Sequence, residues 1–527
     1  MDESRAARID EPRTARRRFL RTLAAAGLAT VAGCGGGGDD GSPGRTDRTA
    51  TVTSPTRTTT DRETDTDRRT ATDRQTTTDR GTDDTPTDTP GGGDRGIDPA
   101  VVAGIERRAV PIEGVDPDTS GDDLSAVADV LADATVVGMG EATHGTWEFQ
   151  AIRHRLVRTL VAEHGLGAVA FEDNFAGLRP VDEYVRHGEG DLDAAMDAFG
   201  DYIFHTEEVR RMLAWLRSYN DGRPPRDRVG VYGLDMQTAG DATGRIRAYL
   251  QEVDRAYLDD VDERLDGVVA SDDRQFDEGE VETLLDLAAD LRARFENRRA
   301  SYVAASSRAE WELALRNVRV IEQSGLRGEA MLEGSTAREK LRLGFEVRER
   351  TMAENARWVA EFVDGPVAFW AHNTHVARGT RDEGPDGDPP PTQGEFLARA
   401  YGSDYYPLVL TFARGSFAAR LRGGALGRPE VEDPVDGTVA EVCAEVEHPR
   451  FFLDFEAVSA DTDVATWLDR THGLHNVGLT WGGSVDVNEF RPRADADGLV
   501  FVEETTPTEA TEGDGGRIGR RSGRTVP

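Results

Sequence analysis

The chain has 527 residues, of which 98 are acidic and 63 basic, giving a formal net charge of −35. Lys340 is the only lysine, so arginine carries nearly all of the positive charge. A surface this acidic repels nucleic acids and anionic lipid headgroups, which excludes a typical nucleic-acid-binding protein. An acid-rich, lysine-poor composition is typical of a protein that works at high salt, where a Debye length of about 3 Å at 1 M screens the repulsion.

The first 33 residues are predicted to be a removable twin-arginine (Tat) signal peptide. Arg16-Arg17-Arg18-Phe19-Leu20 supplies the twin-arginine pattern, and a run of small and apolar residues extends from Leu23 to Gly33. This run is too short to span a hydrocarbon core about 30 Å thick, which favours a signal peptide over a transmembrane helix. Val31-Ala32-Gly33-Cys34 matches a lipoprotein cleavage box. We therefore expect a lipid on Cys34 that anchors the exported protein at the outer face of the cell membrane.

Residues 34–97 consist mostly of Thr, Asp, Arg, Gly and Pro, with almost no large apolar side chain. Such a segment cannot offset its conformational entropy by burial, so we predict a disordered linker. Residues 504–527 are also polar and are predicted to be a disordered tail. The folded domain is then expected over 98–503. With Cys34 acylated, Cys443 is the only other cysteine and is expected to be a lone core thiol.

Short apolar runs in the domain are predicted to be buried strands, and a helical pattern from Phe149 to Glu163 follows the first of them. The runs are Thr135–Gly140, Ala168–Glu172, Val229–Leu234, Val367–His372 and Tyr406–Phe412, with Phe451–Phe455 and Val477–Trp481 as candidates for further strands of the sheet. Helical patterns separate the first four runs, which favours an α/β fold with a mainly parallel β-sheet flanked by helices.

Residues 241–362, between the third and fourth predicted strands, have an almost continuous helical pattern. One of its runs places apolar residues at Trp311, Leu315, Val318 and Ile321, which is helical spacing. We predict a large helical insertion that caps the sheet. Together with loops such as 380–393, this insertion is expected to form the pocket walls.

The most informative motif, Met139-Gly140-Glu141-Ala142-Thr143-His144-Gly145, directly follows the first predicted strand. A strand that turns into a helix places Glu141 and His144 at the carboxyl edge of the sheet, where open α/β sheets bind their ligands. The two residues are three apart, close enough for the carboxylate to orient the imidazole. The motif therefore predicts a general base that acts on water.

Other predicted strands end in ionisable residues as well. Glu172 ends the second, Asp235 follows the third, and His372 and His375 follow the fourth. Because the carboxyl ends of parallel strands share one edge of a sheet, we expect these groups to meet His144 in one cleft. A His/Glu cluster of this kind offers the mutual pKa tuning that proton transfer requires.

Two common hydrolytic arrangements are disfavoured by the sequence. It contains no Gly-x-Ser-x-Gly elbow and no His-Glu-x-x-His motif. Three histidines and two carboxylates could still ligate a divalent ion, so a metal-dependent hydrolase remains an alternative. No organic cofactor is expected.

Seven motifs occur in order along the chain. They are Gly140-Glu141-Ala142-Thr143-His144-Gly145, Phe171-Glu172, Thr206-Glu207-Glu208, Trp215-Leu216-Arg217-Ser218-Tyr219-Asn220, Tyr232-Gly233-Leu234-Asp235, Met352-Ala353-Glu354-Asn355 and Trp370-Ala371-His372-Asn373-Thr374-His375. Over about residues 100–420, their order and spacing resemble the erythromycin esterase family. The chain is identified as a member of the haloarchaeal, exported lipoprotein type.

The resemblance implies hydrolysis of an ester or lactone without a serine nucleophile. The residues that it assigns to the cleft are His144, as the general base, with Glu141, Arg153, Glu172, His372 and His375. On this interpretation Glu141 or Glu172 orients His144, while His372 or His375, with Arg153, stabilises the oxyanion or protonates the leaving group. Ile203-Phe204-His205 and Arg348-Glu349 depart from the family pattern, which more often has tryptophans and Arg-Asp there.

The expected partner is a small-molecule or glycan substrate with an ester or lactone bond. No nucleic acid is expected, and the membrane is contacted only through Cys34. A second alternative is a non-catalytic surface lipoprotein that binds a glycan or metabolite in the same cleft.

Overall fold

The computed structural model describes residues 96–119, 121–268, 276–363, 365–379 and 389–511. All of them belong to the second of two compact units, Gly91–Pro527. The predicted signal peptide, Cys34, nearly all of the linker and most of the loop 380–393 lie outside the described residues. Within these ranges, no helix combines the length and apolar character needed to cross a bilayer.

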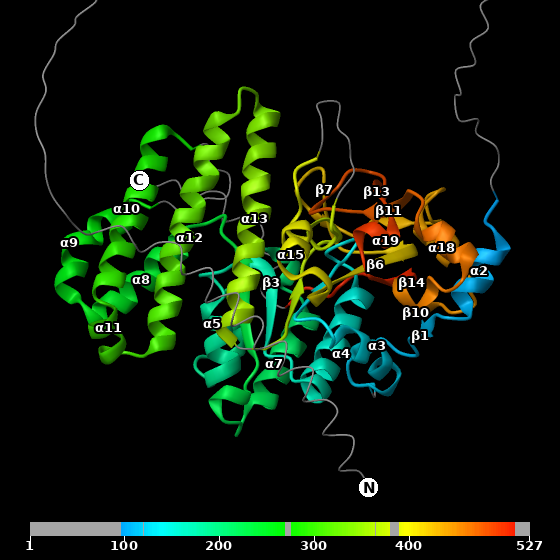
Figure 1. Ribbon diagram of the computed structural model, residues 1–527, viewed down its shortest axis with the longest axis horizontal. Helices are drawn as coiled ribbons and strands as arrows, with labels where there is room; N and C mark the ends of the chain where they lie inside the picture. The colour runs from blue at the N-terminus through cyan, green and yellow to red at the C-terminus, as the bar shows by residue number, and fades with distance from the viewer. Residues whose placement is uncertain (1–95, 120, 269–275, 364, 380–388, 512–527) are drawn as a thin grey trace, which may run out of the picture. The chain divides into compact units, whose positions relative to one another are not determined.

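A nine-stranded sheet forms the centre of this unit (Figure 1), in the order β1-β10-β14-β6-β2-β5-β3-β4 with β9 paired to β6. Its strands are β1 (Val110–Pro111), β2 (Val136–Met139), β3 (Ala168–Asn174), β4 (Gly230–Asp235), β5 (Val367–Trp370), β6 (Tyr405–Ser416), β9 (Glu430–Val431), β10 (Arg450–Asp454) and β14 (Gly498–Thr505). The strands from β14 to β4 pair in parallel, whereas β1, β9 and β10 pair antiparallel. The predicted mainly parallel α/β sheet is confirmed.

The prediction that Val477–Trp481 adds to this sheet is wrong. The position beside β6 belongs to β14, whose apolar run is longer and fully buried. Thr480–Trp481 instead forms β12 in a small sheet with β7 (Ala419–Leu421) and β8 (Leu426–Gly427). A further two-stranded sheet pairs β11 (His472–Asn476) with β13 (Asp486–Phe490).

Alternation along the strands sends successive side chains to opposite faces of the sheet. Val137, Phe171 and Trp370 lie on one face, in a core shared with helices of the first part of the chain. Those helices are α3 (Ser125–Leu131), α4 (Trp147–His164), α5 (Arg179–Asp182), α6 (Leu192–Asp197) and α7 (Glu207–Asn220). Val136 and Phe369 lie on the opposite face, in a core shared with the helical insertion.

The insertion consists of helices in its described residues. They are α8 (Gly240–Val253), α9 (Arg255–Asp266), α10 (Glu278–Asn297), α11 (Arg299–Ala305), α12 (Arg308–Glu333) and α13 (Ala337–Val363). Among the described helices of the insertion, α13 makes the main contacts with β3, β4 and β5, while α10 and α8 pack against α12, which packs on α13 (Figure 1). The insertion thus covers one face of the sheet mainly through α13, and α14 (Asn373–Val376) and α15 (Gln393–Tyr401) complete this side.

A third core lies against β6, β10 and β14. Its helices are α2 (Pro99–Glu106), α16 (Val439–Cys443), α17 (Phe455–Val458) and α18 (Thr462–Leu468), and α19 (Pro492–Asp495) precedes β14. Cys443 is a free, buried thiol in this core, as the sequence predicted.

The prediction that a disordered tail starts at residue 504 is wrong for residues 504–511. Strand β14 continues to Thr505, and residues 506–511 then form backbone hydrogen bonds with Gly145, Trp147, His205 and Glu207. These threonine-rich residues are held by main-chain pairing and not by apolar burial, so composition could not reveal their order. The remainder of the predicted tail, 512–527, lies outside the described residues.

Gly233 in β4 offers a test of this fold. The register of β3 against β4 shifts between Phe171 and Asn174. A Cβ atom on Gly233 would lie 2.4 Å from the Asn174 carbonyl oxygen. We expect Gly233→Ala to lower the free energy of unfolding by about 1–3 kcal/mol, because backbone must move.

Chemical denaturation at constant salt measures this effect. Gly244→Ala in α8 is the control, since nothing lies within 4 Å of its added Cβ atom. Alanine should there stabilise the helix by about 0.5–1 kcal/mol. Equal stability of the two variants would contradict the register at the end of β3.

Candidate active site

A buried carboxylate links the end of β2 to α4. The Glu141 Oε1 atom lies 2.7 Å from His144 Nδ1, and the Glu141 Oε2 atom accepts a hydrogen bond from the Arg153 guanidinium. The Arg153 guanidinium also lies 3.8 Å from the centroid of the Trp370 ring. Glu141 and Arg153 are 1% and 0% exposed, whereas His144 is 8% exposed. Of the two carboxylates that the sequence offered to orient His144, Glu141 is the one that contacts the ring.

The backbone around this motif is tightly enclosed. A Cβ atom on Gly140 would lie 2.1 Å from the Asn373 side-chain oxygen, and one on Gly145 would lie 1.9 Å from the Ala418 carbonyl oxygen. Val477 donates its N–H to the Ala142 carbonyl oxygen at 2.8 Å. Glycine at both positions therefore lets the loop pass between β6 and the segment that follows β11.

His144 combines a held nitrogen with an available one. Since Nδ1 donates to the anionic Glu141, Nε2 carries the lone pair, and no described residue hydrogen-bonds to it. Burial disfavours the imidazolium, but the Glu141 contact, with Glu172 and Asp201 farther away, raises the pKa of His144 above 6.5. Burial also opposes ionisation of Glu141, yet Arg153 and His144 hold its pKa below the usual 4.5.

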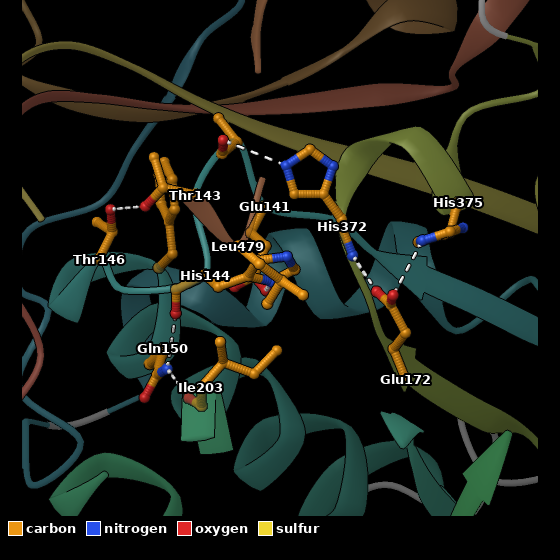
Figure 2. A network of polar contacts seen from close by, with 12 residues as sticks. Glu141, Thr143, His144, Thr146, Gln150, Glu172, Ile203, His372, His375 and Leu479 are labelled. Carbon is orange, nitrogen blue, oxygen red and sulfur yellow. Dashed lines mark hydrogen bonds and ion pairs between the residues drawn. The ribbon is translucent and has the colours of Figure 1, made fainter. Parts of the chain in front are cut away.

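A second cluster surrounds Glu172, which lies within the irregular stretch of β3 (Figure 2). One of its carboxylate oxygens lies 2.9 Å from His375 Nε2, and the other accepts the backbone N–H of His372 at 3.0 Å. The Arg348 guanidinium lies 2.9 Å from Glu172 and 2.7 Å from Asp235. The bulge thus turns Glu172 toward α13 and α14.

His375 lies between two carboxylates. Its Nδ1 atom is 2.7 Å from Glu349, on the side opposite Glu172. Burial favours the neutral imidazole, but Glu172 and Glu349 outweigh it and raise the pKa of His375 to about 10. Burial favours the protonated carboxyl of Glu172, but His375 and Arg348 outweigh burial and hold the pKa of Glu172 well below its usual range. His375 is therefore a cation at neutral pH.

His372 has the opposite protonation. Its Nδ1 atom accepts the Thr374 backbone N–H at 3.3 Å, and its Nε2 atom lies 3.3 Å from the Ala142 carbonyl oxygen. Burial and the charge of His144 lower the pKa of His372 to about 4. The His372 and His144 ring centroids are 5.0 Å apart, so a neutral imidazole lies beside the proposed base.

The structure brings all six predicted site residues to the carboxyl edge of the sheet, in two linked clusters. Their positions assign two of them differently from the sequence hypothesis. Arg153 is fully buried behind Glu141, and both ring nitrogens of His375 are paired. These two side chains hold carboxylates in place and do not face an open cleft.

Sequence reasoning expected Asp235 at this edge but missed three charged residues of the site. Two of them, Arg348 and Glu349, form the ion pairs with Glu172, Asp235 and His375 described above. The third, Asp201, contributes to the raised pKa of His144, and burial raises the pKa of Asp201 itself. Asp235 ends a strand and so carried a signal, whereas Arg348 lies inside a long helix where most charged residues face solvent.

Metal binding was an open alternative. Among the residues that the structure describes, no three His, Cys, Asp or Glu side chains are grouped to hold a metal ion. Both nitrogens of His375 lie against carboxylate oxygens, whereas those of His372 lie against the Thr374 N–H and the Ala142 carbonyl oxygen, so neither side chain points a free nitrogen at a common centre.

The parallel sheet, its two helical faces and the buried histidine and carboxylate centre define an α/β protein with its polar site at the carboxyl edge. A sequence profile of the family described as erythromycin esterase matches residues 161–505. The chain belongs to the erythromycin esterase family. The matched region contains Glu172, His372 and His375, whereas Glu141, His144 and Arg153 precede it.

Relatives by sequence include two bacterial proteins. Erythromycin esterase type II of Escherichia coli is 28% identical over 136 residues, a match that covers 26% of this chain and 32% of that enzyme. Protein YbfO of Bacillus subtilis (strain 168) is 22% identical over 426 residues, covering 77% of this chain and 91% of YbfO.

Solved structures share the fold. A Bacillus cereus protein superposes with a TM-score of 0.69 at 24% identity, covering 78% of this chain and 98% of its own. A mutant of the erythromycin esterase EreC in its open conformation gives a TM-score of 0.56 at 16% identity, with 76% and 98% covered. The likeness extends over nearly all of both solved chains.

The histidine environments predict a pH-dependent stability. The pKa of His375 is raised from 6.5 to about 10. The stabilisation of the fold by the charged His375 ring is therefore complete below pH 6.5 and is lost as the pH rises through 10. In protein with ¹³C-labelled histidine, the NMR signal of His375 should stay in its charged form until strongly alkaline pH.

Glu349→Gln removes one of the two flanking carboxylates and should lower the pKa of His375. The variant His375→Gln identifies the signal by its disappearance. A His375 signal that titrates near 6.5 in the unaltered chain contradicts the assigned ion pairs.

Proposed function

We propose that this protein is a hydrolase that cleaves a carboxylic ester or lactone with His144 as the general base. The observation that carries this proposal is the His144 ring, whose Nδ1 is held by Glu141 while Nε2 has no partner among the described residues. Membership of the erythromycin esterase family supports a hydrolase of this class. The histidine mechanism and the ester or lactone substrate are our inferences.

In the proposed reaction, the Nε2 atom of His144 accepts a proton from water as the water oxygen attacks the substrate carbonyl carbon. The tetrahedral intermediate then collapses by breaking the bond to the leaving oxygen. The imidazolium returns its proton to that alkoxide, so one water is consumed and an alcohol and a carboxylic acid form. Glu141 stabilises the transient imidazolium and keeps Nδ1 protonated between turnovers.

The other site residues have supporting roles in this scheme. Arg153 is fully buried and donates a hydrogen bond to Glu141, so it fixes the position of that carboxylate and does not contact the substrate. The neutral His372 ring avoids placing a second cation next to His144 during proton transfer. His375 and Arg348 are cations paired with Glu172, so they offset the negative charge of that carboxylate close to the base.

We also propose a class of substrate and a cellular location for the protein. The backbone carbonyl of Ile203 lies 3.4 Å from the Gln150 amide nitrogen, which also donates to the His144 carbonyl oxygen at 3.2 Å (Figure 2). Residues around Ile203 therefore form one wall beside the base, consistent with a small-molecule or glycan ester or lactone. We further propose export by the twin-arginine route and a lipid anchor on Cys34.

His144→Ala tests the base directly. We expect kcat toward the best substrate in a panel of lactones and acyl sugars to fall by about 10²–10⁴-fold, because no group replaces the base. His187→Ala, an exposed histidine after α5, is the matched control and should leave kcat unchanged.

Turnover that survives His144→Ala contradicts the mechanism. Turnover that disappears on exhaustive chelation and returns with a divalent ion favours the metal-dependent alternative. Ligand binding without turnover in the unaltered chain favours the non-catalytic alternative.

The pH profile tests the contact between Glu141 and His144. His144 acts as a base only when neutral, so kcat/KM should rise with pH through an acid limb that lies above pH 6.5. Glu141→Gln removes the carboxylate that raises this pKa, and the limb should move to lower pH. Glu189→Gln, at an exposed position, should leave the limb in place. An unmoved limb in Glu141→Gln excludes His144 as the titrating group.

A further inference from the structure

The segment that follows β14 lies across the catalytic loop. The Trp147 N–H donates to the Thr506 carbonyl oxygen at 2.9 Å, and the Thr508 N–H donates to the Gly145 carbonyl oxygen at 3.0 Å. Thr146 and Pro507 form an antiparallel bridge between these two bonds. The residues next to His144 in sequence are thus paired with the chain's C-terminal region, beyond the family match that ends at residue 505.

A side-chain contact reinforces this pairing. The Glu148 carboxylate accepts the Thr506 N–H and the Thr506 hydroxyl, each at 2.8 Å. Glu148 is 6% exposed, so this carboxylate is buried where its hydrogen bonds are not replaced by water. Glu148 is the second residue of α4, and the contact therefore holds the point at which the loop enters the helix.

The same segment continues to the wall around Ile203. The Glu207 N–H donates to the Glu509 carbonyl oxygen at 2.9 Å, and the Thr511 N–H donates to the His205 carbonyl oxygen at 3.1 Å. Gln150 closes the arrangement, because its amide contacts the Ile203 carbonyl oxygen and the Thr206 hydroxyl. The loop that carries His144 and the wall beside it are joined to one another through residues 506–511.

We propose that residues 506–511 are a positioning strap for the active site, and that Glu148 and Thr506 are positioning residues for His144. The inference rests on the proposed function, since it concerns the placement of the base. The Gly145 carbonyl oxygen also accepts the Ala418 N–H at 2.9 Å, so the strap supplies the second of two donors to this atom. Without the strap, the Gly145 carbonyl oxygen keeps its hydrogen bond from Ala418 but loses the one from Thr508.

Two shortened chains provide the main test. A chain that ends at Thr511 keeps the strap, and a chain that ends at Thr505 removes it while leaving β14 complete. We expect kcat to fall by about 100-fold in the shorter chain relative to the longer, because a shift of about 1 Å in a catalytic group has this effect. KM should change much less, and the acid limb of kcat/KM should move to lower pH as His144 separates from Glu141.

Point variants keep the proposal testable if the shorter chain does not fold. Glu148→Ala and Thr506→Val should each lower kcat, and the double variant should lower it less than the product of the two effects. Glu148→Gln should restore much of the activity because it keeps an acceptor for the Thr506 N–H. Thr466→Val removes a hydroxyl that bonds within α18 and should have no effect.

Hydrogen exchange separates this inference from the proposed function. The amides of Trp147 and Glu207, which donate to the strap, should lose protection in the chain that ends at Thr505, while amides of β14 stay protected. This result supports the strap even if the intact chain hydrolyses no ester, in which case the proposed function fails by itself. Equal exchange in both chains, or equal kcat in two active chains, overturns the strap.

Discussion

The buried Glu141 carboxylate is the contact on which the rest of the site depends. Removing an ion pair from water is unfavourable unless its remaining hydrogen-bonding positions are filled. Arg153 meets this condition by pairing with Glu141, donating to two backbone carbonyls and lying over the Trp370 ring. Because these partners belong to β2, α4 and the end of β5, one ion pair fixes the relative placement of three elements. His144 takes its orientation from that arrangement.

Three imidazoles within one site have three different protonation properties, and the cause is local in each. His375 is flanked by two carboxylates and is held as a cation. His372 faces a carbonyl oxygen and a backbone N–H, and it is held neutral. Of the three, only His144 has a single carboxylate partner and a second nitrogen with no partner among the described residues, so it can accept a further proton when neutral. The division of roles follows from neighbours and not from residue type.

The helical insertion has a chemical as well as a covering role. Its last helix, α13, packs on β3, β4 and β5 and delivers Arg348 and Glu349 to the carboxyl edge. Arg348 allows Glu172 and Asp235 to be buried as anions side by side, which like charges alone would prevent. The second cluster therefore exists only when the insertion is docked on the sheet.

The sequence by itself determined the α/β class, the first four parallel strands and the helical insertion, and it pointed to six candidate residues that gather at the carboxyl edge, because apolar periodicity and strand-end position are local signals. Only the tertiary structure decided which charged side chains of the site pair with one another. Arg153 turned out to lie behind Glu141, and Arg348 came from a helix more than 170 residues beyond Glu172. It also decided the place of Val477–Trp481 and the order of residues 506–511, since both depend on pairing with distant backbone. Hydrogen bonds between remote main-chain segments leave no periodic trace in composition, whereas burial of a strand or helix does.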